Sequence, residues 1–139
     1  QAYGQAKTAN ALFAMGVDAR GQDRDIRAFS VHPGGIFTPL QRHLPEEEMV
    51  ALGWKNPDGT VPEAVQQAFK TPEQGAATTV WAATSAQLDG LGGLYCEDVD
   101  VAPLAGAVSP GHQHVRPWAC DPEAAERLWT VSEEWLADA

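Results

Sequence analysis

A helical pattern followed closely by a strand pattern is the feature that most constrains the fold of this chain. Residues 2–20 have apolar side chains at helical spacing, frequent alanine and no proline, which predicts a helix. After Gly21 and a short polar loop, residues 26–31 are rich in β-branched and aromatic side chains, which predicts a strand. That strand runs into a turn with two consecutive glycines. A helix, a short loop and a strand form the repeating unit of a parallel α/β sheet, and we expect that fold class.

Two later helices have clear start signals. Thr71 before a proline predicts the N-cap of a helix that extends to about residue 86, and Asp121 before a proline predicts a last helix over residues 121–136. A stripe of side chains along the last helix is expected to pack against the core: Ala125, Leu128, Trp129, Ser132, Trp135 and Leu136. Residues 93–97 predict a second short strand.

The stretch between residues 38 and 70 is irregular. Prolines interrupt it repeatedly, and only residues 46–52 and 62–69 have the pattern of short helices. A long irregular excursion in a compact domain is usually functional or mobile.

Composition excludes several classes of function. The 139 residues carry a net charge of −10, which argues against nucleic acid as a partner because phosphate binding needs a basic surface. No apolar run reaches the roughly 18 residues that a membrane span requires, and we see no secretory signal. Cys96 and Cys120 are far apart and form neither a metal-binding framework nor a disulfide scaffold, so we expect a cytoplasmic protein. The length suits one domain, or part of one.

Tyr3 and Lys7 are the first candidate site. Side chains four residues apart on a helix project from the same face, one turn apart. A free tyrosine titrates at about pH 10, and a neighbouring ammonium group favours the phenolate, which suits acid/base catalysis at an alcohol or carbonyl oxygen. The pair is also common by chance, so an exposed tyrosine and a solvated lysine are an alternative interpretation.

The turn that follows the first predicted strand is the second candidate site. A strand that ends in a glycine-containing turn brings backbone close to ligands at the carboxyl edge of an α/β sheet. Thr38 adds a hydroxyl group and Ile36 its main-chain groups, whereas His32 alone is more typical of a structural residue. An ordinary strand-exit turn is the alternative.

The two candidates occur in a specific order. Tyr-x-x-x-Lys, a strand, Pro-Gly-Gly-Ile-Phe-Thr, Thr-Pro-Glu-Gln-Gly-Ala and Gly-Gly-Leu-Tyr follow one another along the chain. This order resembles the C-terminal half of the short-chain dehydrogenase/reductase family, and within it the retinol-dehydrogenase-like and related bacterial oxidoreductases. The resemblance implies a Rossmann-like, doubly wound parallel sheet, of which residues 1–139 are the C-terminal part and residues 38–70 the variable substrate-binding lobe.

The resemblance also implies roles for individual residues. Tyr3 corresponds to the catalytic acid/base, and Lys7 to its partner, which also holds the nicotinamide ribose. The residues that correspond to the cofactor-binding turn are Pro33, Gly34, Gly35, Ile36 and Thr38. The implied cofactor is NAD or NADP, and the implied substrate is a small molecule with an alcohol or carbonyl group that exchanges a hydride with it.

Several family features are missing from this sequence. The glycine-rich phosphate-binding turn, the residue that distinguishes NAD from NADP, and the family's catalytic Ser and Asn would all precede Gln1, and the sequence opens without Met. We therefore expect the C-terminal portion of a chain about twice as long, and we expect this portion alone to be inactive.

Other residues give weaker signals. His112 and His114 lie near each other, but without nearby carboxylates or thiols they do not predict a metal site, and we expect none. Trp54 is the best aromatic candidate for lining a substrate pocket, and neither cysteine has the surroundings of a nucleophile.

Three alternatives stay open at the level of the sequence. A sugar-nucleotide epimerase or dehydratase of the family's extended branch shares the Tyr and Lys but needs a larger substrate domain. A non-catalytic nicotinamide-binding regulatory module has the same fold. An unrelated binding domain would place Tyr3 and Thr38 on opposite sides of the sheet. Family members often pair through the helix that carries Tyr and Lys, so a homo-oligomer is compatible with residues such as Ala6, Asn10 and Phe13, which could equally be core.

Overall fold

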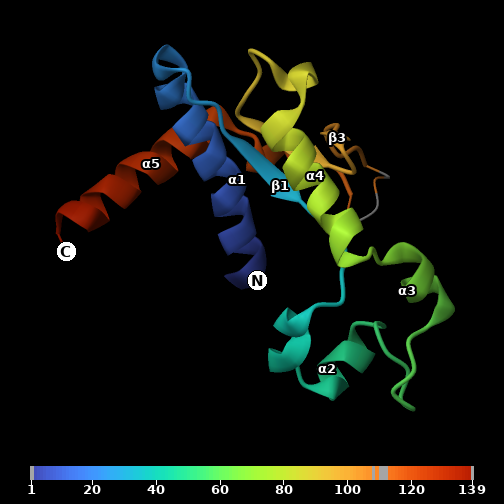
Figure 1. The fold of residues 1–139 in the computed structure, drawn as a ribbon. Coiled ribbons are helices and arrows are strands. Elements are labelled where there is room, and N and C mark those ends of the chain that lie inside the picture. The colour runs from blue at the N-terminus through green and yellow to red at the C-terminus, as the bar shows by residue number, and fades with distance from the viewer. Residues whose placement is uncertain (1, 108, 110–112, 139) are drawn as a thin grey trace.

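The structure, a computed structural model, describes residues 2–107, 109 and 113–138. Its helices and strands, in chain order, are α1 (Ala2–Gly21), β1 (Phe29–His32), α2 (Glu46–Ala51), α3 (Glu63–Ala68), α4 (Pro72–Thr84), β2 (Leu94–Glu97), β3 (Asp100–Val101) and α5 (Pro122–Ala137). In Figure 1, β1 lies between α1 and α4, and both helices contact β1 and β2. The α/β class predicted from the sequence is confirmed.

The sheet of the described residues is mixed rather than purely parallel. Its order is β1-β2-β3, and β1 runs parallel to β2 with Phe29 opposite Leu94 and His32 opposite Glu97. β3 pairs with β2 in the antiparallel direction, through a tight turn at Asp98. The described sheet is therefore parallel only between β1 and β2, because the chain reverses directly after β2.

Local start signals were the most accurate predictions. The Thr71 hydroxyl accepts a hydrogen bond from the Gln74 N–H at 3.2 Å, and the Gln74 side chain accepts one from the Thr71 N–H at 2.9 Å. The Asp121 carboxylate likewise accepts a hydrogen bond from the Glu123 N–H at the start of α5. Both predicted helices therefore begin where their caps indicated.

The first predicted strand is shorter than expected. It begins at Phe29 because the preceding residues are used to end α1: the Ile26 N–H donates to the Gly21 carbonyl at 3.0 Å, and Asp25 has a left-handed backbone with φ 56°. Ile26 has a high strand propensity, but its N–H is used to end α1, so Ile26 does not join the strand.

The predicted packing stripe of α5 contacts the core only in the first half of the helix. Ala125 is buried, and the Trp129 ring stacks on Phe13 of α1 with centroids 5.4 Å apart. Gly16 makes this contact possible, since a Cβ there would lie 3.0 Å from the Trp129 ring. Trp135 and Leu136 are 71% and 77% exposed, so their predicted burial is wrong.

The first two turns of α1 also extend away from the core. Ala6 and Asn10 are exposed and Phe13 is 50% exposed, whereas the buried side of α1 begins at Ala11 and Leu12. Figure 1 shows this end of α1 projecting beyond the sheet toward the lobe formed by residues 38–70. Among the described residues, no helix combines the length and apolar character required to cross a bilayer.

Candidate functional site

Tyr3 and Lys7 lie together at the start of α1. The Lys7 Nζ is 5.3 Å from the centroid of the Tyr3 ring, as expected for residues one helical turn apart. Tyr3 is 74% exposed and Lys7 is also exposed. Within the described part of the chain, neither the Tyr3 hydroxyl nor the Lys7 ammonium has a hydrogen-bond or ion-pair partner on another residue. Both polar groups can therefore meet a ligand.

The glycines of the turn after β1 are required by packing within the chain. Gly34 has φ +90°, a conformation that L side chains rarely adopt, and a Cβ there would lie 2.9 Å from Lys70 Cδ. A Cβ on Gly35 would lie 3.0 Å from the Phe69 ring. Lys70 and Phe69 thus cover one side of the turn, whereas Pro33 and Gly35 stay exposed.

Ile36 fixes the turn to α4. A Cβ on Gly75 would lie 2.0 Å from Ile36 Cδ1, so the Ile36 side chain occupies the space that Gly75 leaves on the helix. The Ile36 carbonyl accepts a hydrogen bond from Gln41 Nε2 at 2.8 Å. Pro33 contributes nearby through its carbonyl, 3.7 Å from the same Gly75 position.

Thr38 begins the lobe. Its hydroxyl accepts a hydrogen bond from the Leu40 N–H at 3.3 Å and lies 3.2 Å from Gln41 Oε1, to which it donates. These contacts cap a short 3-10 helix at Pro39–His43. The Thr38 side chain therefore has a structural partner of its own in this arrangement.

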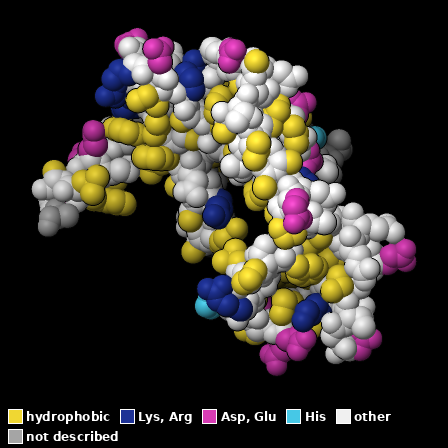
Figure 2. Space-filling view, in the orientation of Figure 1, with side chains coloured by type: hydrophobic (Ala, Val, Ile, Leu, Met, Phe, Trp, Pro, Cys, Tyr) yellow, Lys and Arg dark blue, Asp and Glu magenta, His cyan; other side chains and the backbone are white. Residues whose placement is uncertain are grey.

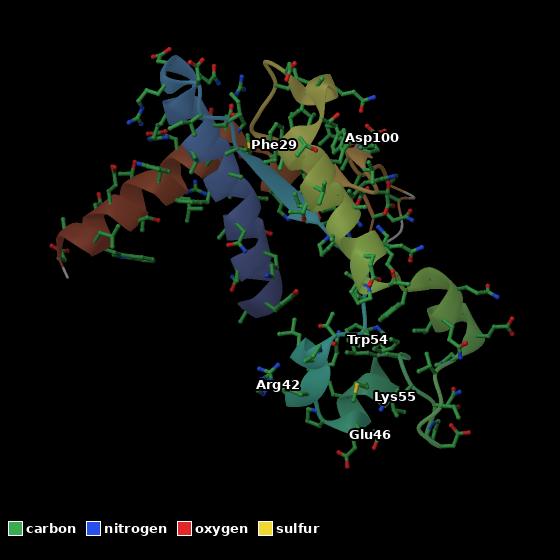
Figure 3. All side chains as sticks on the ribbon, in the orientation of Figure 1. Phe29, Arg42, Glu46, Trp54, Lys55 and Asp100 are labelled. Atoms are coloured by element: carbon green, nitrogen blue, oxygen red, sulfur yellow. The ribbon has the colours of Figure 1, made fainter. Side chains whose placement is uncertain are left out.

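The lobe is held by a small aromatic cluster. The Phe69 ring is 4.6 Å from the Phe37 ring and 5.8 Å from the Trp54 ring, centroid to centroid. Trp54 thus packs against Phe69 inside the lobe (Figure 3), with Lys55 and Glu46 paired at 3.1 Å beside it. A backbone bridge between Ile36 and Lys70 closes the lobe at its base.

The arrangement of these parts is visible in the figures. In Figure 1, the N-terminal end of α1 and the chain leaving β1 are both directed toward the lobe. Figure 2 shows the surface hollowed between α1 and the side formed by α4 and the lobe. A phenol and an ammonium group exposed on one side of a helix can exchange a proton with, and hydrogen-bond to, an oxygen-bearing ligand.

Glu97 is a buried acidic residue at the end of β2, and it is not among the site residues predicted from the sequence. It is 8% exposed, its carboxylate accepts a hydrogen bond from the His114 N–H at 2.8 Å, and His32 Nδ1 lies 3.7 Å away. The available signal was an acidic residue at the end of a predicted strand, beside the strand that ends in His32. Glu97 thus attaches the later loop to the carboxyl ends of β1 and β2.

Within the described residues, the histidines and cysteines form no metal-binding group. His114 Nδ1 is 3.0 Å from Ser109 Oγ, and His112 lies outside the described residues. Among the residues that are described, no three His, Cys, Asp or Glu side chains group as a metal site would require. Burial raises the pKa of the Cys96 thiol, with the Asp100 carboxylate adding to it, and burial and Asp121 raise the pKa of Cys120. Raised values disfavour the reactive thiolate.

Comparisons with known proteins extend over nearly the whole chain. It is 44% identical over 138 residues to a protein named probable oxidoreductase from Streptomyces lividans, covering 98% of this chain and 45% of that protein. It is 37% identical over 139 residues to short-chain dehydrogenase/reductase prx1 from Penicillium roqueforti, covering 98% of this chain and 38% of that protein. It is 30% identical over 135 residues to mouse (Mus musculus) retinol dehydrogenase 12, covering 97% of this chain and 36% of that protein.

The chain therefore spans less than half the length of these curated relatives. No family model and no solved structure matches it.

Proposed function

Because the chain is homologous to short-chain dehydrogenase/reductases over nearly its whole length, we propose that its protein is an NAD(P)-dependent oxidoreductase with Tyr3 as the acid/base. One observation carries the assignment of the site. Tyr3 and Lys7 lie against each other on α1, exposed and without partners elsewhere in the described residues. Both polar groups are therefore open to a ligand, and their match to the family's Tyr-x-x-x-Lys pattern supports the role.

The donor set fits a nicotinamide cofactor and an alcohol or carbonyl substrate. Lys7 offers three N–H donors to ribose hydroxyls, and the uncovered side of residues 33–36 offers backbone groups to the nicotinamide end. Thr38 is assigned to the same contact zone, in addition to capping Pro39–His43. When bound, the cofactor would supply or accept the hydride.

The protein's own part in the reaction is proton transfer. The Tyr3 hydroxyl would donate its proton to the oxygen of a carbonyl substrate, or accept one from an alcohol in the reverse direction. Negative charge left on the Tyr3 oxygen would be stabilised by the Lys7 ammonium, which already lies over the ring. The lobe of residues 38–70 would cover the substrate and exclude water.

We also propose that the described sheet belongs to a larger Rossmann-like, doubly wound sheet. β1 and β2 are parallel and α4 lies on the connection between them, which is the unit from which such sheets are built. β1 is an edge strand of the described sheet, so one row of its backbone groups is open to a further strand. The cytoplasmic location and the inactivity of residues 1–139 alone belong to the same proposal.

Replacing the Tyr3 hydroxyl tests the proposed function. In the full-length protein, we expect Tyr3→Phe to lower kcat by about 10²–10⁴-fold, the usual contribution of a positioned acid/base. The dissociation constant for NADH or NADPH, measured by fluorescence titration, should change little because the ring remains. Lys7→Met should weaken both turnover and cofactor binding, since Lys7 has two roles.

Tyr95→Phe is the matched control. Tyr95 lies half-buried on β2, and no hydrogen bond within the described residues uses its hydroxyl, so this variant should keep wild-type turnover. Wild-type turnover in Tyr3→Phe would rule out the acid/base role. Failure of the wild-type protein to bind either nicotinamide cofactor would rule out the proposed class.

A further inference from the structure

Lys70 contacts the turn after β1 in two ways. Its backbone N–H donates a hydrogen bond to the Gly35 carbonyl at 2.8 Å. Its aliphatic chain lies over Gly34, where a Cβ would come within 2.9 Å of both Cδ and Cε. No other side chain lies among the nearest atoms around Gly34, so the stem of Lys70 forms the back of the turn at this residue.

Asp98 holds the far end of the Lys70 side chain. The two residues form an ion pair, although they come from different segments: Lys70 ends the lobe, and Asp98 begins the turn between β2 and β3. The pair lines an open groove of about 430 Å³, together with residues that include Phe69 and Val99. Side-chain exposures of 25% for Lys70 and 66% for Asp98 place the pair where an ion pair contributes little to unfolding free energy.

The turn that carries Asp98 is itself fixed in an unusual conformation. Asp98 and Val99 have φ 50° and 62°, in the left-handed region that is rare for a β-branched residue. The Val99 N–H donates to Thr78 Oγ1 at 3.1 Å, and Thr78 is fully buried on α4. A backbone in such a conformation persists only where its surroundings hold it, and here they aim Asp98 at Lys70.

We propose that Lys70 and Asp98 are a positioning pair for the turn at residues 33–35. The stem of Lys70 supports the turn, and Asp98 keeps that stem extended across Gly34. This assignment rests on the proposed function, in which the opposite side of the turn faces the nicotinamide. Loss of the pair should therefore loosen the turn and weaken cofactor binding, while the proton transfer at Tyr3 stays intact.

Three variants of the full-length protein separate the stem from the charge. Lys70→Ala removes both, Lys70→Met keeps most of the stem, and Asp98→Asn removes only the tether. For Lys70→Ala we expect about tenfold faster amide hydrogen exchange at residues 34–38 and about tenfold weaker NADH or NADPH binding, with kcat within about threefold of wild type. Lys70→Met and Asp98→Asn should give smaller, equal effects, and combining those two should add nothing further.

Lys55→Met is the matched control. Lys55 pairs with Glu46 on the lobe, and its side chain is 27% exposed, close to the 25% of Lys70. It should leave both exchange at the turn and cofactor affinity unchanged.

Two results would overturn the proposal. One is unchanged exchange at residues 34–38 in Lys70→Ala, and the other is faster exchange spread evenly over α1, α4 and β2, which would indicate a merely structural role. The exchange measurement needs no cofactor. Amide exchange therefore tests the positioning role even if the wild-type protein binds no nicotinamide cofactor. Absence of cofactor binding would overturn the proposed function and not the positioning role.

Discussion

Asp18 is the most buried charged side chain in the described part of the chain, at 3% exposure. Its carboxylate accepts hydrogen bonds from Arg27 Nε at 2.8 Å, Arg27 Nη2 at 2.9 Å and the Ala28 N–H at 3.1 Å. Gly92 leaves room for it, since a Cβ there would lie 1.8 Å from Asp18 Oδ1. One carboxylate thus joins α1, the start of β1 and the approach to β2.

Asp18 should make the stability of the protein acid-sensitive. Burial opposes its ionisation, but the hydrogen bonds from Arg27, Ala28 and Gln22 outweigh burial and lower its pKa. A carboxyl whose pKa is lower in the folded state stabilises the fold above its unfolded pKa of about 3.9, and loses that contribution as pH falls through the folded value. We expect Asp18→Asn to lower the free energy of unfolding by about 2–3 kcal/mol at pH 7. The variant should also lose less stability than wild type as the pH falls from 7 to 3, measured by urea unfolding.

The exposed Asp89 supplies the control for this prediction. No side-chain hydrogen bond or ion pair involves Asp89 within the described residues, so Asp89→Asn should leave the unfolding curve unchanged. If Asp18→Asn loses as much stability at low pH as wild type, another carboxyl group dominates acid unfolding.

Single residues were predictable where their partners are close in sequence. The Thr71 and Asp121 caps bond to residues two or three positions later, so their signals are complete within a short segment. The pairs Asp18–Arg27 and Lys70–Asp98 join residues 9 and 28 positions apart, and only the folded chain brings them together. Tyr3 and Lys7 could be paired in advance because a helix fixes their separation.

At the level of elements, α4 contacts the sheet through small residues. Gly75 and Thr78 are its buried positions, three residues apart, whereas the apolar Val80 is 59% exposed and Trp81 is only half-buried. Hydrophobicity therefore did not indicate the buried face of this helix. The buried face is instead the one that carries Gly75, because the missing side chain leaves space that Ile36 occupies.

Gly75→Ala should destabilise the protein despite the better helix propensity of alanine. The new Cβ would lie 2.0 Å from Ile36 Cδ1, which forces Ile36 and the turn beside it to move. We expect a cost of about 1–3 kcal/mol, typical of overpacking, in thermal or urea unfolding.

Gly4→Ala is the same substitution in a helix with nothing within 4 Å of the new Cβ. It should leave stability unchanged or raise it slightly, by up to about 1 kcal/mol. Equal stability of both variants would show that Ile36 repacks without cost.

At the scale of the whole molecule, the structure separates into a sheet with its helices and a lobe with a cluster of its own. Contacts within the lobe include the ring of Trp54 against Phe69, on which Phe37 also packs, and the Lys55–Glu46 pair. Figure 1 shows α2 and α3 set apart from the sheet, below α4. We therefore expect the lobe to open as a unit at lower free energy than the sheet.

Trp54→Ala tests this independence. It should speed amide exchange across Glu46–Ala51 by about tenfold or more, while amides of Phe29–His32 and Leu94–Glu97 keep wild-type exchange, measured by mass spectrometry. Trp135→Ala is the control, because Trp135 is 71% exposed and should alter neither region. Faster exchange in both regions of Trp54→Ala would mean that lobe and sheet unfold together.

The overall class could be predicted from the alternation of helix and strand, but the reversal into β3 could not. The Asp98 and Val99 turn has positive φ at both residues without the glycine or asparagine that usually indicates it. The exposure of Trp135 and Leu136 was equally hidden, because an amphipathic pattern shows that a face is apolar without showing what covers it.

The bridge between Ile36 and Lys70 has a consequence for engineering and for evolution. Because Ile36 and Lys70 pair with each other, the residues between them, 37–69, form a cassette whose ends meet. A donor segment of different length can replace this cassette without stretching the framework, provided that the framework keeps Gly34, Gly35 and Lys70. Such an exchange would alter the lobe and leave α1, with Tyr3 and Lys7, as it is.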